Sequence, residues 1–350
     1  MEEQKKILVV DDNSVNLKLA EQTLKEFSKP VLVPSGKIAL DYLEKNKPSL
    51  ILLDIIMPEM NGYEVMEKLK ANPLTSEIPV IFLTADLDAE TEVKCLALGA
   101  MDFVRKPFEP AVLSNRVKHA LEILEYRNNL EKLVHIKTAQ LEHIQYEVIM
   151  SIANLIENRD NTTGHHVKRT SNYVSMIINS AKKTLYPELE DSYIYNVIRA
   201  APLHDIGKIS ISDTILQKPG PLTDEEFEIM KKHTLIGANI IQDNFKDIED
   251  PLYIKIATNV ALYHHEKWNG QGYPEGLSEK EIPLEARIMA IADVFDALTT
   301  KRCYKKAFPV NDAFKILEES SGSHFDPELL KLFLQLRPEI EEMLNKSEVN

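Results

Sequence analysis

The sequence places an imidazole and a carboxylate side by side at His204 and Asp205, at the end of an apolar, helix-like run. Neighbouring side chains on a helix point about 100° apart, so these two cannot both bind one metal ion from the same direction. They can serve two metal ions, with a carboxylate oxygen of Asp205 shared between the ions and His204 bound to one of them. The pair therefore indicates a centre with two metals.

Further donors follow in the chain at His233, at the adjacent His264 and His265, and at Asp293. A single histidine is more often a surface or core residue, and it is the combination that favours a metal centre. Imidazoles and carboxylates without thiolates suit Fe, Mn, Co, Ni or Zn. These donors are too many for one tetrahedral ion, whereas two ions about 3.5–4 Å apart can share them and hold a nucleophile for in-line attack on phosphorus. We therefore expect hydrolysis of a phosphodiester.

Basic residues near these donors fit an anionic substrate. Lys208 lies one turn past Asp205 on any continuing helix, which would place a cation beside the phosphate. Arg302, Lys305 and Lys306 form a local basic cluster just past Asp293. A local cluster is needed because the chain has a net charge of −14, which argues against nucleic acid or a membrane surface as a partner.

The helices that would carry these donors have recognisable starts. Helical periodicity dominates the C-terminal part, where we expect an all-α domain. Thr223-Asp-Glu-Glu226 is typical of a capping box that opens the helix presenting His233. Pro251 begins a second expected helix, which ends at the adjacent histidines, and Pro283 begins the one that carries Asp293.

The N-terminal part alternates short apolar runs with amphipathic stretches. Because the runs are continuously apolar, they suit strands buried on both faces of a parallel sheet with helices on each side. The expected strands cover residues 7–10, 31–33, 50–53, 80–83 and, more weakly, 102–104. This part is therefore predicted to be an α/β domain.

Polar side chains stand at the ends of these strands, where an open α/β sheet binds its ligand. They are Asp11, Asp12, Asp54, Thr84 and Lys106. Three converging carboxylates would repel one another without a divalent cation among them, and hard oxygen ligands favour Mg²⁺. The lysine and the threonine could then bind oxygens of a phosphoryl group on Asp54. Taken singly, these aspartates could cap a helix or end a strand, but together they favour an acidic site.

A long helix is expected between the two parts, since no proline or glycine occurs between Pro110 and Gly164. A single helix over residues 111–157 would span roughly 70 Å. Its apolar residues recur at a mixture of three-, four- and seven-residue spacings, which fits a two-stranded coiled coil with imperfect register. We expect a parallel homodimer, and the alternative is that the stripe packs only on the protein's own domains.

The start of the chain, its hydropathy and its cysteines limit the class of protein. The start of the chain is too short and too acidic for a signal peptide, and no apolar run is long enough to cross a bilayer, so we expect a cytoplasmic protein. Cys95 and Cys303 are far apart and match no thiolate metal pattern.

The N-terminal part resembles the receiver domain of bacterial response regulators. The matching stretches are ILVVDDN (7–13), LLDIIMPEMNG (52–62), LTA (83–85) and RKPF (105–108). The resemblance implies a flavodoxin-like fold, a phosphoacceptor at Asp54, and Mg²⁺ held by Asp11, Asp12 and Asp54. It also implies a switch formed by Thr84 and Phe103, and a cognate sensor histidine kinase as partner.

The segment 151–336 resembles the HD-GYP family of cyclic di-GMP phosphodiesterases. The matching stretches are LHDIGK (203–208), LQKPGPL (216–222), HHEKWNGQGYP (264–274), ADVFDAL (292–298) and HFDP (324–327). The resemblance implies cleavage of cyclic di-GMP to linear pGpG, and in some members onward to GMP. Fe or Mn are the first candidates for the metals, with Ni, Co or Zn as alternatives. The implied metal ligands are His204, Asp205, His233, His264, His265 and Asp293.

The same resemblance implies further roles around the substrate. Lys208 would lie beside the reacting phosphate, and Arg302 and Lys305 would bind substrate phosphates. The loop formed by Gly272, Tyr273 and Pro274 would lie near the substrate.

One departure from the family bears on the number of metals. His166 falls where the family has a histidine that is able to bind a further metal, but members with three metals carry a glutamate where this chain has Thr162. Threonine is a poor ligand, so we expect two metals, with the role of His166 left open. Glu157 is close in sequence, but nothing in the pattern assigns it to a metal.

We therefore predict a receiver domain over residues 1–120, a helical, coiled-coil linker over 121–150, and an HD-GYP phosphodiesterase domain of the HD superfamily over 151–342. Phosphorylation of the receiver would control hydrolysis by changing the receiver's dimer face and the long helix. The alternatives are a non-catalytic scaffold that binds cyclic di-GMP or a partner protein, and a phosphodiesterase that prefers linear pGpG. The intact set of metal ligands with Lys208 argues against the scaffold.

Overall fold

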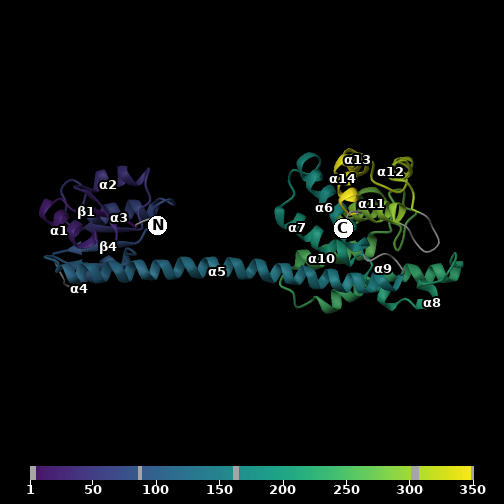
Figure 1. Cartoon of the computed structure of the whole chain (residues 1–350), viewed down its shortest axis with the longest axis horizontal. Helices are drawn as coiled ribbons and strands as arrows, with labels where there is room; N and C mark the ends of the chain where they lie inside the picture. The colour runs from purple at the N-terminus through teal and green to yellow at the C-terminus, as the bar shows by residue number, and fades with distance from the viewer. Residues whose placement is uncertain (1–4, 86–88, 161–164, 301–306, 348–350) are drawn as a thin grey trace. The chain divides into compact units, whose positions relative to one another are not determined.

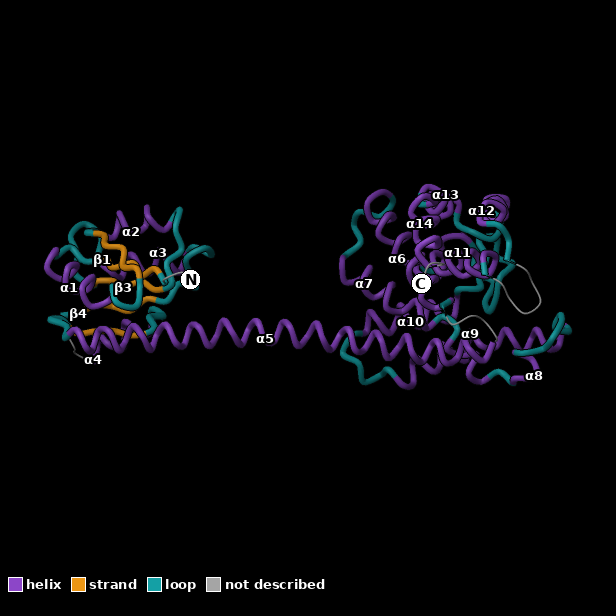
Figure 2. The backbone as a smooth tube through the Cα atoms, viewed as in Figure 1, coloured by secondary structure: helices purple, strands orange, loops and turns teal. Residues whose placement is uncertain are grey.

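The computed structural model describes residues 5–85, 89–160, 165–300 and 307–347 (Figure 1). The chain divides into two compact units, Met1–Thr138 and Ala139–Asn350. In the described parts of the chain, the strands of the sheet all belong to the first unit, as Figure 2 shows. Among the described residues, none of the helices combines the length and the apolar character that a bilayer span requires.

The first unit contains a five-stranded parallel sheet with the order β2-β1-β3-β4-β5. This order and the parallel pairing confirm the flavodoxin-like fold. The strands match the predicted apolar runs to within two residues at each end. They are β1 (Lys6–Val10), β2 (Lys29–Val33), β3 (Leu50–Asp54), β4 (Val80–Thr84) and β5 (Asp102–Arg105).

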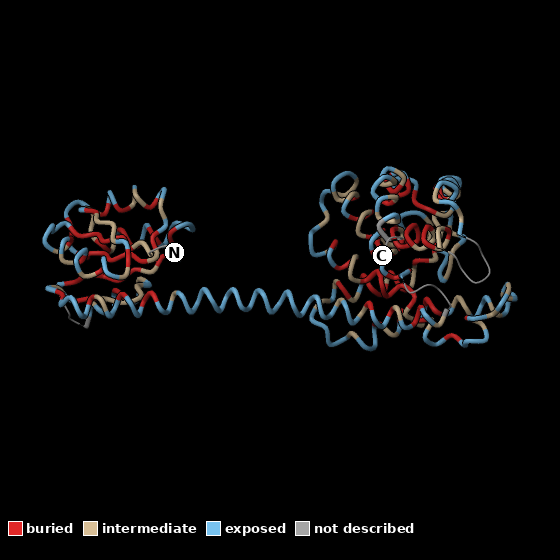
Figure 3. The backbone as a smooth tube through the Cα atoms, in the orientation of Figure 1, coloured by how far each residue is buried: buried red, intermediate tan, exposed pale blue. Residues whose placement is uncertain are grey.

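Both faces of this sheet are covered, which explains the continuous apolar runs. In β3, Ile51 and Leu53 enter one core cluster, whereas Leu50 and Leu52 enter the cluster on the opposite face. Alternate side chains of a strand point to opposite faces, so a strand covered on both sides needs apolar residues throughout (Figure 3). The helices of this unit are α1 (Ser14–Leu24), α2 (Gly36–Leu43), α3 (Gly62–Ala71), α4 (Ala89–Ala97) and the start of α5 (Pro110–Glu157).

The second unit is helical, as predicted. Its α-helices are α6 (His166–Thr184), α7 (Asp191–Ala200), α8 (Asp213–Leu216), α9 (Asp224–Asn244), α10 (Pro251–Tyr263), α11 (Leu284–Thr299), α12 (Val310–Glu319), α13 (Pro327–Gln335) and α14 (Arg337–Ser347). Short 3₁₀ helices add η1 (Asn158–Asp160), η2 (Ala201–Leu203), η3 (Ile206–Ser210) and η4 (Glu279–Glu281). One core cluster, built around Tyr173, Tyr253 and Phe295, packs α6, α7, α10, α11, α12 and α13 together.

The helix starts agree with the local sequence signals. The predicted capping box is present at α9, where Thr223 Oγ1 accepts from the backbone of Glu226, and the Glu226 carboxylate accepts from the backbone of Thr223. At α10, Asp250 caps the helix and Pro251 occupies its first turn, where a missing N–H does no harm. These caps fix the ends of the helices that present the donors.

Helix α5 is continuous over Pro110–Glu157, which confirms the predicted long helix. Its first turns pack into the receiver core through Leu113 and Val117. Its last turns pack on α6, where Met150 and Ala153 contact Val167. Between these ends, large apolar side chains are exposed, namely Leu130, Leu133, Val134, Leu141, Ile144 and Val148.

Candidate metal centre

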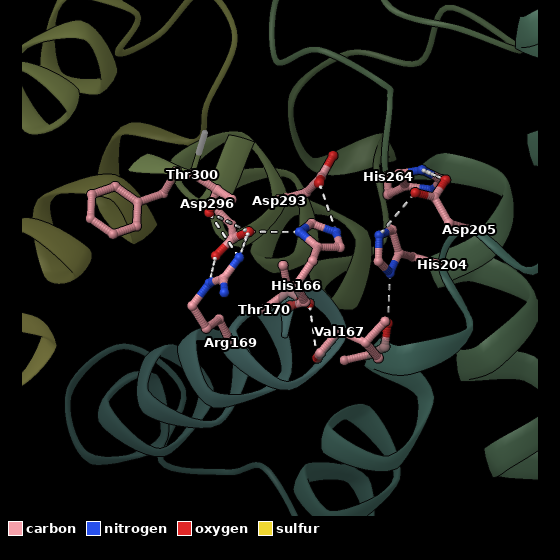
Figure 4. Close-up of polar contacts among 12 residues, drawn as sticks. His166, Val167, Arg169, Thr170, His204, Asp205, His264, Asp293, Asp296 and Thr300 are labelled. Carbon is pink, nitrogen blue, oxygen red and sulfur yellow. Dashed lines mark hydrogen bonds and ion pairs between the residues drawn. The ribbon is translucent and has the colours of Figure 1, made fainter. Parts of the chain in front are cut away.

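The structure brings the predicted donors of the second unit together from several helices. His204 and Asp205 stand between η2 and η3, and His233 lies within α9. His264 caps the end of α10 and is followed by His265, while Asp293 projects from α11. Figure 4 shows the imidazoles of His166 and His204 side by side, between Asp293 and the pair of Asp205 and His264.

The first group of donors comprises Asp205, His233, His264 and His265, whose ligand atoms all lie within 4.8 Å of one another. His233 Nε2 lies 3.2 Å from Asp205 Oδ1, and His264 Nε2 lies 3.8 Å from the same oxygen. Within the described residues, Asp205 Oδ1 is buried without a hydrogen-bond partner. A buried carboxylate oxygen that faces imidazole nitrogens fits a divalent cation held between them.

The second group comprises His166, His204 and Asp293, again with ligand atoms within 4.8 Å of one another. His166 Nε2 lies 3.6 Å from Asp293 Oδ1. His204 Nε2 lies 3.3 Å from Asp205 Oδ2, which is the second oxygen of the carboxylate in the first group. The two oxygens of Asp205 therefore face the two groups separately, which is the arrangement that a shared carboxylate requires.

Hydrogen bonds on the far side of the rings fix which nitrogen faces the centre. In four of the histidines Nδ1 donates a hydrogen bond to an oxygen atom, so Nδ1 carries a proton and Nε2 is the nitrogen that faces the donor groups. The contacts are His166 to Asp296 Oδ2 at 2.7 Å, His204 to the Ala201 carbonyl at 2.9 Å, His233 to the Met230 carbonyl at 2.7 Å and His264 to the Val260 carbonyl at 2.9 Å. This is the tautomer that metal-binding histidines adopt.

The electrostatics of the site also suit cations. Burial lowers the pKa of His264 to about 3, and the charges of His204 and His233 act in the same direction. Burial likewise holds the pKa of His265 well below its ordinary value. In contrast, Asp205 raises the pKa of His204 to about 9 despite its burial. A metal that binds His204 therefore displaces a proton.

Lys208 lies beside the shared carboxylate, because η3 places it one turn after Asp205. Its Nζ is 2.8 Å from Asp205 Oδ2. A cavity of about 280 Å³ opens over this point, and its lining includes Lys208, Lys218, His233, His265, Tyr273 and Asp293. The cavity thus joins both donor groups to two cationic side chains.

The loop with Gly272, Tyr273 and Pro274 lies at this cavity. The Tyr273 ring packs on His265 with centroids 4.8 Å apart. Glu266 holds the loop, since its Oε1 accepts from the backbone N–H groups of Glu275 at 2.8 Å and Gly276 at 3.0 Å. A Cβ on Gly272 would lie 2.3 Å from the Lys267 backbone nitrogen, so only glycine allows this close approach.

Two buried acids at the centre were not assigned from the sequence. Asp296 accepts from His166 and from the guanidinium of Arg169, at 2.6 Å from Nε. Burial favours the neutral acid, but these donors outweigh it and lower the pKa of Asp296 below its usual value. Glu157 offers a ligand atom within 4.8 Å of those of His166 and Asp205. Asp296 could have been found from the sequence, because it lies one helical turn after Asp293 in the same motif. No feature of the sequence pointed to Glu157.

The acidic residues of the receiver also converge as expected. Ligand oxygens of Asp11, Asp12 and Asp54 lie within 4.8 Å of one another. Lys106 Nζ lies 2.6 Å from Asp11 Oδ2 and 2.7 Å from Asp54 Oδ2. Burial raises the pKa of Asp54, although Lys106 opposes this shift. Thr84 ends the neighbouring strand β4, and Phe103 lies in β5.

Several predicted residues lie outside the described part of the chain. They are Thr162, Arg302, Cys303, Lys305 and Lys306.

Each of the two units matches a known protein family. Residues 150–329 match the model of the HD domain family, and residues 7–118 match the model of the response regulator receiver domain. A probable cyclic di-GMP phosphodiesterase of Vibrio cholerae is 42% identical, over 94% of this chain and 77% of that protein. A cyclic di-GMP phosphodiesterase of Thermotoga maritima is 36% identical, over 97% of this chain and 92% of that protein.

The name of a third relative includes the term response regulator. The cyclic di-GMP phosphodiesterase response regulator RpfG of Xanthomonas campestris is 34% identical, over 87% of this chain and 80% of that protein. The similarity to these relatives extends across both the receiver and the HD domain. The chain therefore belongs to the family of response regulators in which a receiver domain is joined to a metal-dependent phosphodiesterase domain of the HD-GYP type.

Proposed function

We propose that this protein hydrolyses cyclic di-GMP to linear pGpG at a two-metal centre in its HD domain. The observation that carries the proposal is the position of Asp205, whose two carboxylate oxygens face two separate groups of imidazoles. His233, His264 and His265 would hold one ion with Asp205, while His166, His204 and Asp293 would hold the other. The names of the relatives, which are similar over 87–97% of this chain, support the choice of substrate.

When bound, the metals supply Lewis acidity and an activated water for attack on phosphorus. The protein's own residues bind and orient the substrate. Lys208 lies beside Asp205 in the lining of the cavity, where its charge would hold a phosphate oxygen. Tyr273, fixed on His265, forms an apolar wall for the nucleotide. The mixed imidazole and carboxylate donors suit Fe or Mn, with Ni, Co or Zn as alternatives.

Control by phosphorylation is the second part of the proposal. A sensor histidine kinase would phosphorylate Asp54, with Mg²⁺ held by Asp11, Asp12 and Asp54, and with Lys106 and Thr84 as ligands of the phosphoryl group. The convergence of the three aspartates and Lys106 supports this assignment. Thr84 and Phe103 would report the change.

We further propose that the protein is a parallel homodimer through the receiver and α5. The exposed apolar residues of α5, among them Leu130 and Leu141, supply the seam. Light scattering on the full chain tests this, since replacing both leucines by glutamate is expected to give a monomer. A wild-type protein that is monomeric throughout the micromolar range would contradict it.

The substrate is tested by comparing turnover of cyclic di-GMP and pGpG by anaerobically prepared, metal-loaded protein. Faster cleavage of cyclic di-GMP, with pGpG as the first product, is the expected result. Preference for pGpG would favour the linear dinucleotide as the substrate. Binding of cyclic di-GMP without turnover would favour a scaffold.

A further inference from the structure

Glu157 is the last residue of α5 and is only 2% exposed. Its carboxylate belongs to a third group of donors, with His166 and Asp205, whose ligand atoms lie within 4.8 Å of one another. This group overlaps the metal centre at two residues, so Glu157 lies at the edge of the proposed site.

The overlap at His166 decides which ion Glu157 would bind. His166 Nδ1 is hydrogen-bonded to Asp296, so only Nε2 remains for a metal. This one nitrogen therefore serves both its group with His204 and Asp293 and its group with Glu157 and Asp205. One nitrogen lone pair binds one ion. Glu157 and Asp293 are then donors to the same ion.

The packing of α5 supports a fixed position for this carboxylate. Met150 and Ala153, one to two turns before Glu157, are buried against Val167 of α6, and His166 is the first residue of that helix. The two donors thus come from two helix ends that contact each other. A divalent cation bound by His166 would attract the charge of this buried carboxylate.

We propose that Glu157 is a ligand of the metal ion bound by His166, His204 and Asp293. This inference rests on the two-metal centre of the proposed function. With Glu157 as a ligand, the two metal positions differ chemically. One ion is bound by three imidazoles and Asp205, while the other gains a carboxylate-rich set that favours Mn²⁺ or Fe²⁺ over tetrahedral Zn²⁺.

The test is a titration of metal-free, full-length protein with Mn²⁺, followed by electron paramagnetic resonance and by elemental analysis after desalting. Glu157→Gln keeps the size and the hydrogen-bonding capacity of the side chain but removes its charge. We expect this variant to bind the first Mn²⁺ like the wild type and the second at least about tenfold more weakly. Glu147→Gln, on an exposed position of the same helix, should match the wild type for both ions.

A ligand and a purely structural residue are separated by the melting temperature. Loss of a ligand lowers the melting temperature of the metal-loaded protein and leaves that of the metal-free protein unchanged. A structural role lowers both equally and contradicts the proposal. If Glu157→Gln fails to fold, Glu157→Asp takes its place, because it keeps the charge but shortens the reach. Weaker binding of the second ion is expected for it, and wild-type affinity overturns the proposal.

Different results would contradict the role of Glu157 and the two-metal centre. If Glu157→Gln binds two ions, each with the same affinity as the wild type does, only the role of Glu157 is contradicted. If the wild type itself binds fewer than two ions, the two-metal centre and this inference fall together.

Discussion

Nδ1 of His166 lies 2.7 Å from Oδ2 of Asp296, on the adjacent helix α11. The same carboxylate is held by Arg169 through both of its oxygens. The carboxylate therefore stays ionised and accepts a hydrogen bond from Nδ1 of His166, which directs Nε2 of His166 to the donor groups. A carboxylate behind a metal-binding histidine orients the ring and raises its basicity.

Asp296→Asn is expected to weaken binding of the second metal by about 10- to 100-fold. The amide retains the size of the side chain but loses the charge that fixes the tautomer of His166. Titration of the metal-free protein with Mn²⁺ measures the effect, and Asp312→Asn, at an exposed position in α12, is the matched control. Unchanged affinity in Asp296→Asn would show that this hydrogen bond does not position a ligand.

Gly207→Ala tests the close contact between η3 and α9. A Cβ at this position would lie 1.9 Å from the His233 carbonyl oxygen and 2.6 Å from the Gly237 nitrogen, both of which are backbone atoms. The two elements must separate, and overpacking of this kind costs about 1–3 kcal/mol of unfolding free energy. Thermal unfolding measures the cost.

The control for this prediction is Gly237→Ala on the facing helix. Its Cβ would meet its nearest neighbours at 3.3–3.4 Å, which small adjustments can relieve. A smaller loss of stability is expected than for Gly207→Ala. Equal melting temperatures for Gly207→Ala and the wild type would contradict the packing described between η3 and α9.

Asp54→Asn should abolish phosphorylation of the receiver by a small phosphoryl donor such as acetyl phosphate in the presence of Mg²⁺. In the proposed function this carboxylate is the nucleophile, and Lys106 Nζ lies 2.7 Å from its Oδ2. Mass spectrometry of the intact protein detects the added phosphoryl group. Asp41→Asn, at an exposed position of α2, should be modified like the wild type. Modification of Asp54→Asn would place the acceptor elsewhere.

His324 gives a prediction about pH. Its ring stacks on Phe325, and burial lowers its pKa to about 4, with Lys267 acting in the same direction. In the unfolded chain His324 takes up a proton at the ordinary histidine pKa of about 6.5, whereas in the folded chain it stays neutral until the pH is much lower. The stabilisation is therefore complete above pH 6.5 and is lost as the pH falls towards 4.

The difference in unfolding free energy between the wild type and His324→Gln should accordingly shrink from pH 7 to pH 4. Chemical denaturation followed across this range measures the difference. A difference that stays constant over the range would show that His324 is not kept neutral by the fold.

The sequence predicted those features that depend on local signals. Continuous apolar runs located the strands, the capping box at Thr223 located the start of α9, and the absence of proline and glycine predicted α5. The expected helical turn from Asp205 to Lys208 is also present, but as 3₁₀ helix η3 instead of a continuation of α7. Three residues make one turn in that geometry, so the pairing of Lys208 with Asp205 is retained.

The sequence could not supply contacts between distant helices. Asp296 is 130 residues from His166, and only the packing of α6 against α11 makes them partners. The carboxylate of Glu157 lies near His166 and Asp205 because Met150 and Ala153 pack the last turns of α5 against Val167. Periodicity shows which face of a helix is apolar, but it does not show which neighbour that face meets.

Counting bound metals and assaying cyclic di-GMP hydrolysis in parallel, on anaerobically purified wild type and Asp205→Asn, tests whether one shared carboxylate organises the site. The wild type should retain two transition-metal ions per chain and produce pGpG, whereas Asp205→Asn should lose metal and turnover together. Wild-type protein that binds no metal and remains inactive after Fe²⁺ or Mn²⁺ is added, or an Asp205→Asn variant as active as the wild type, would contradict the account.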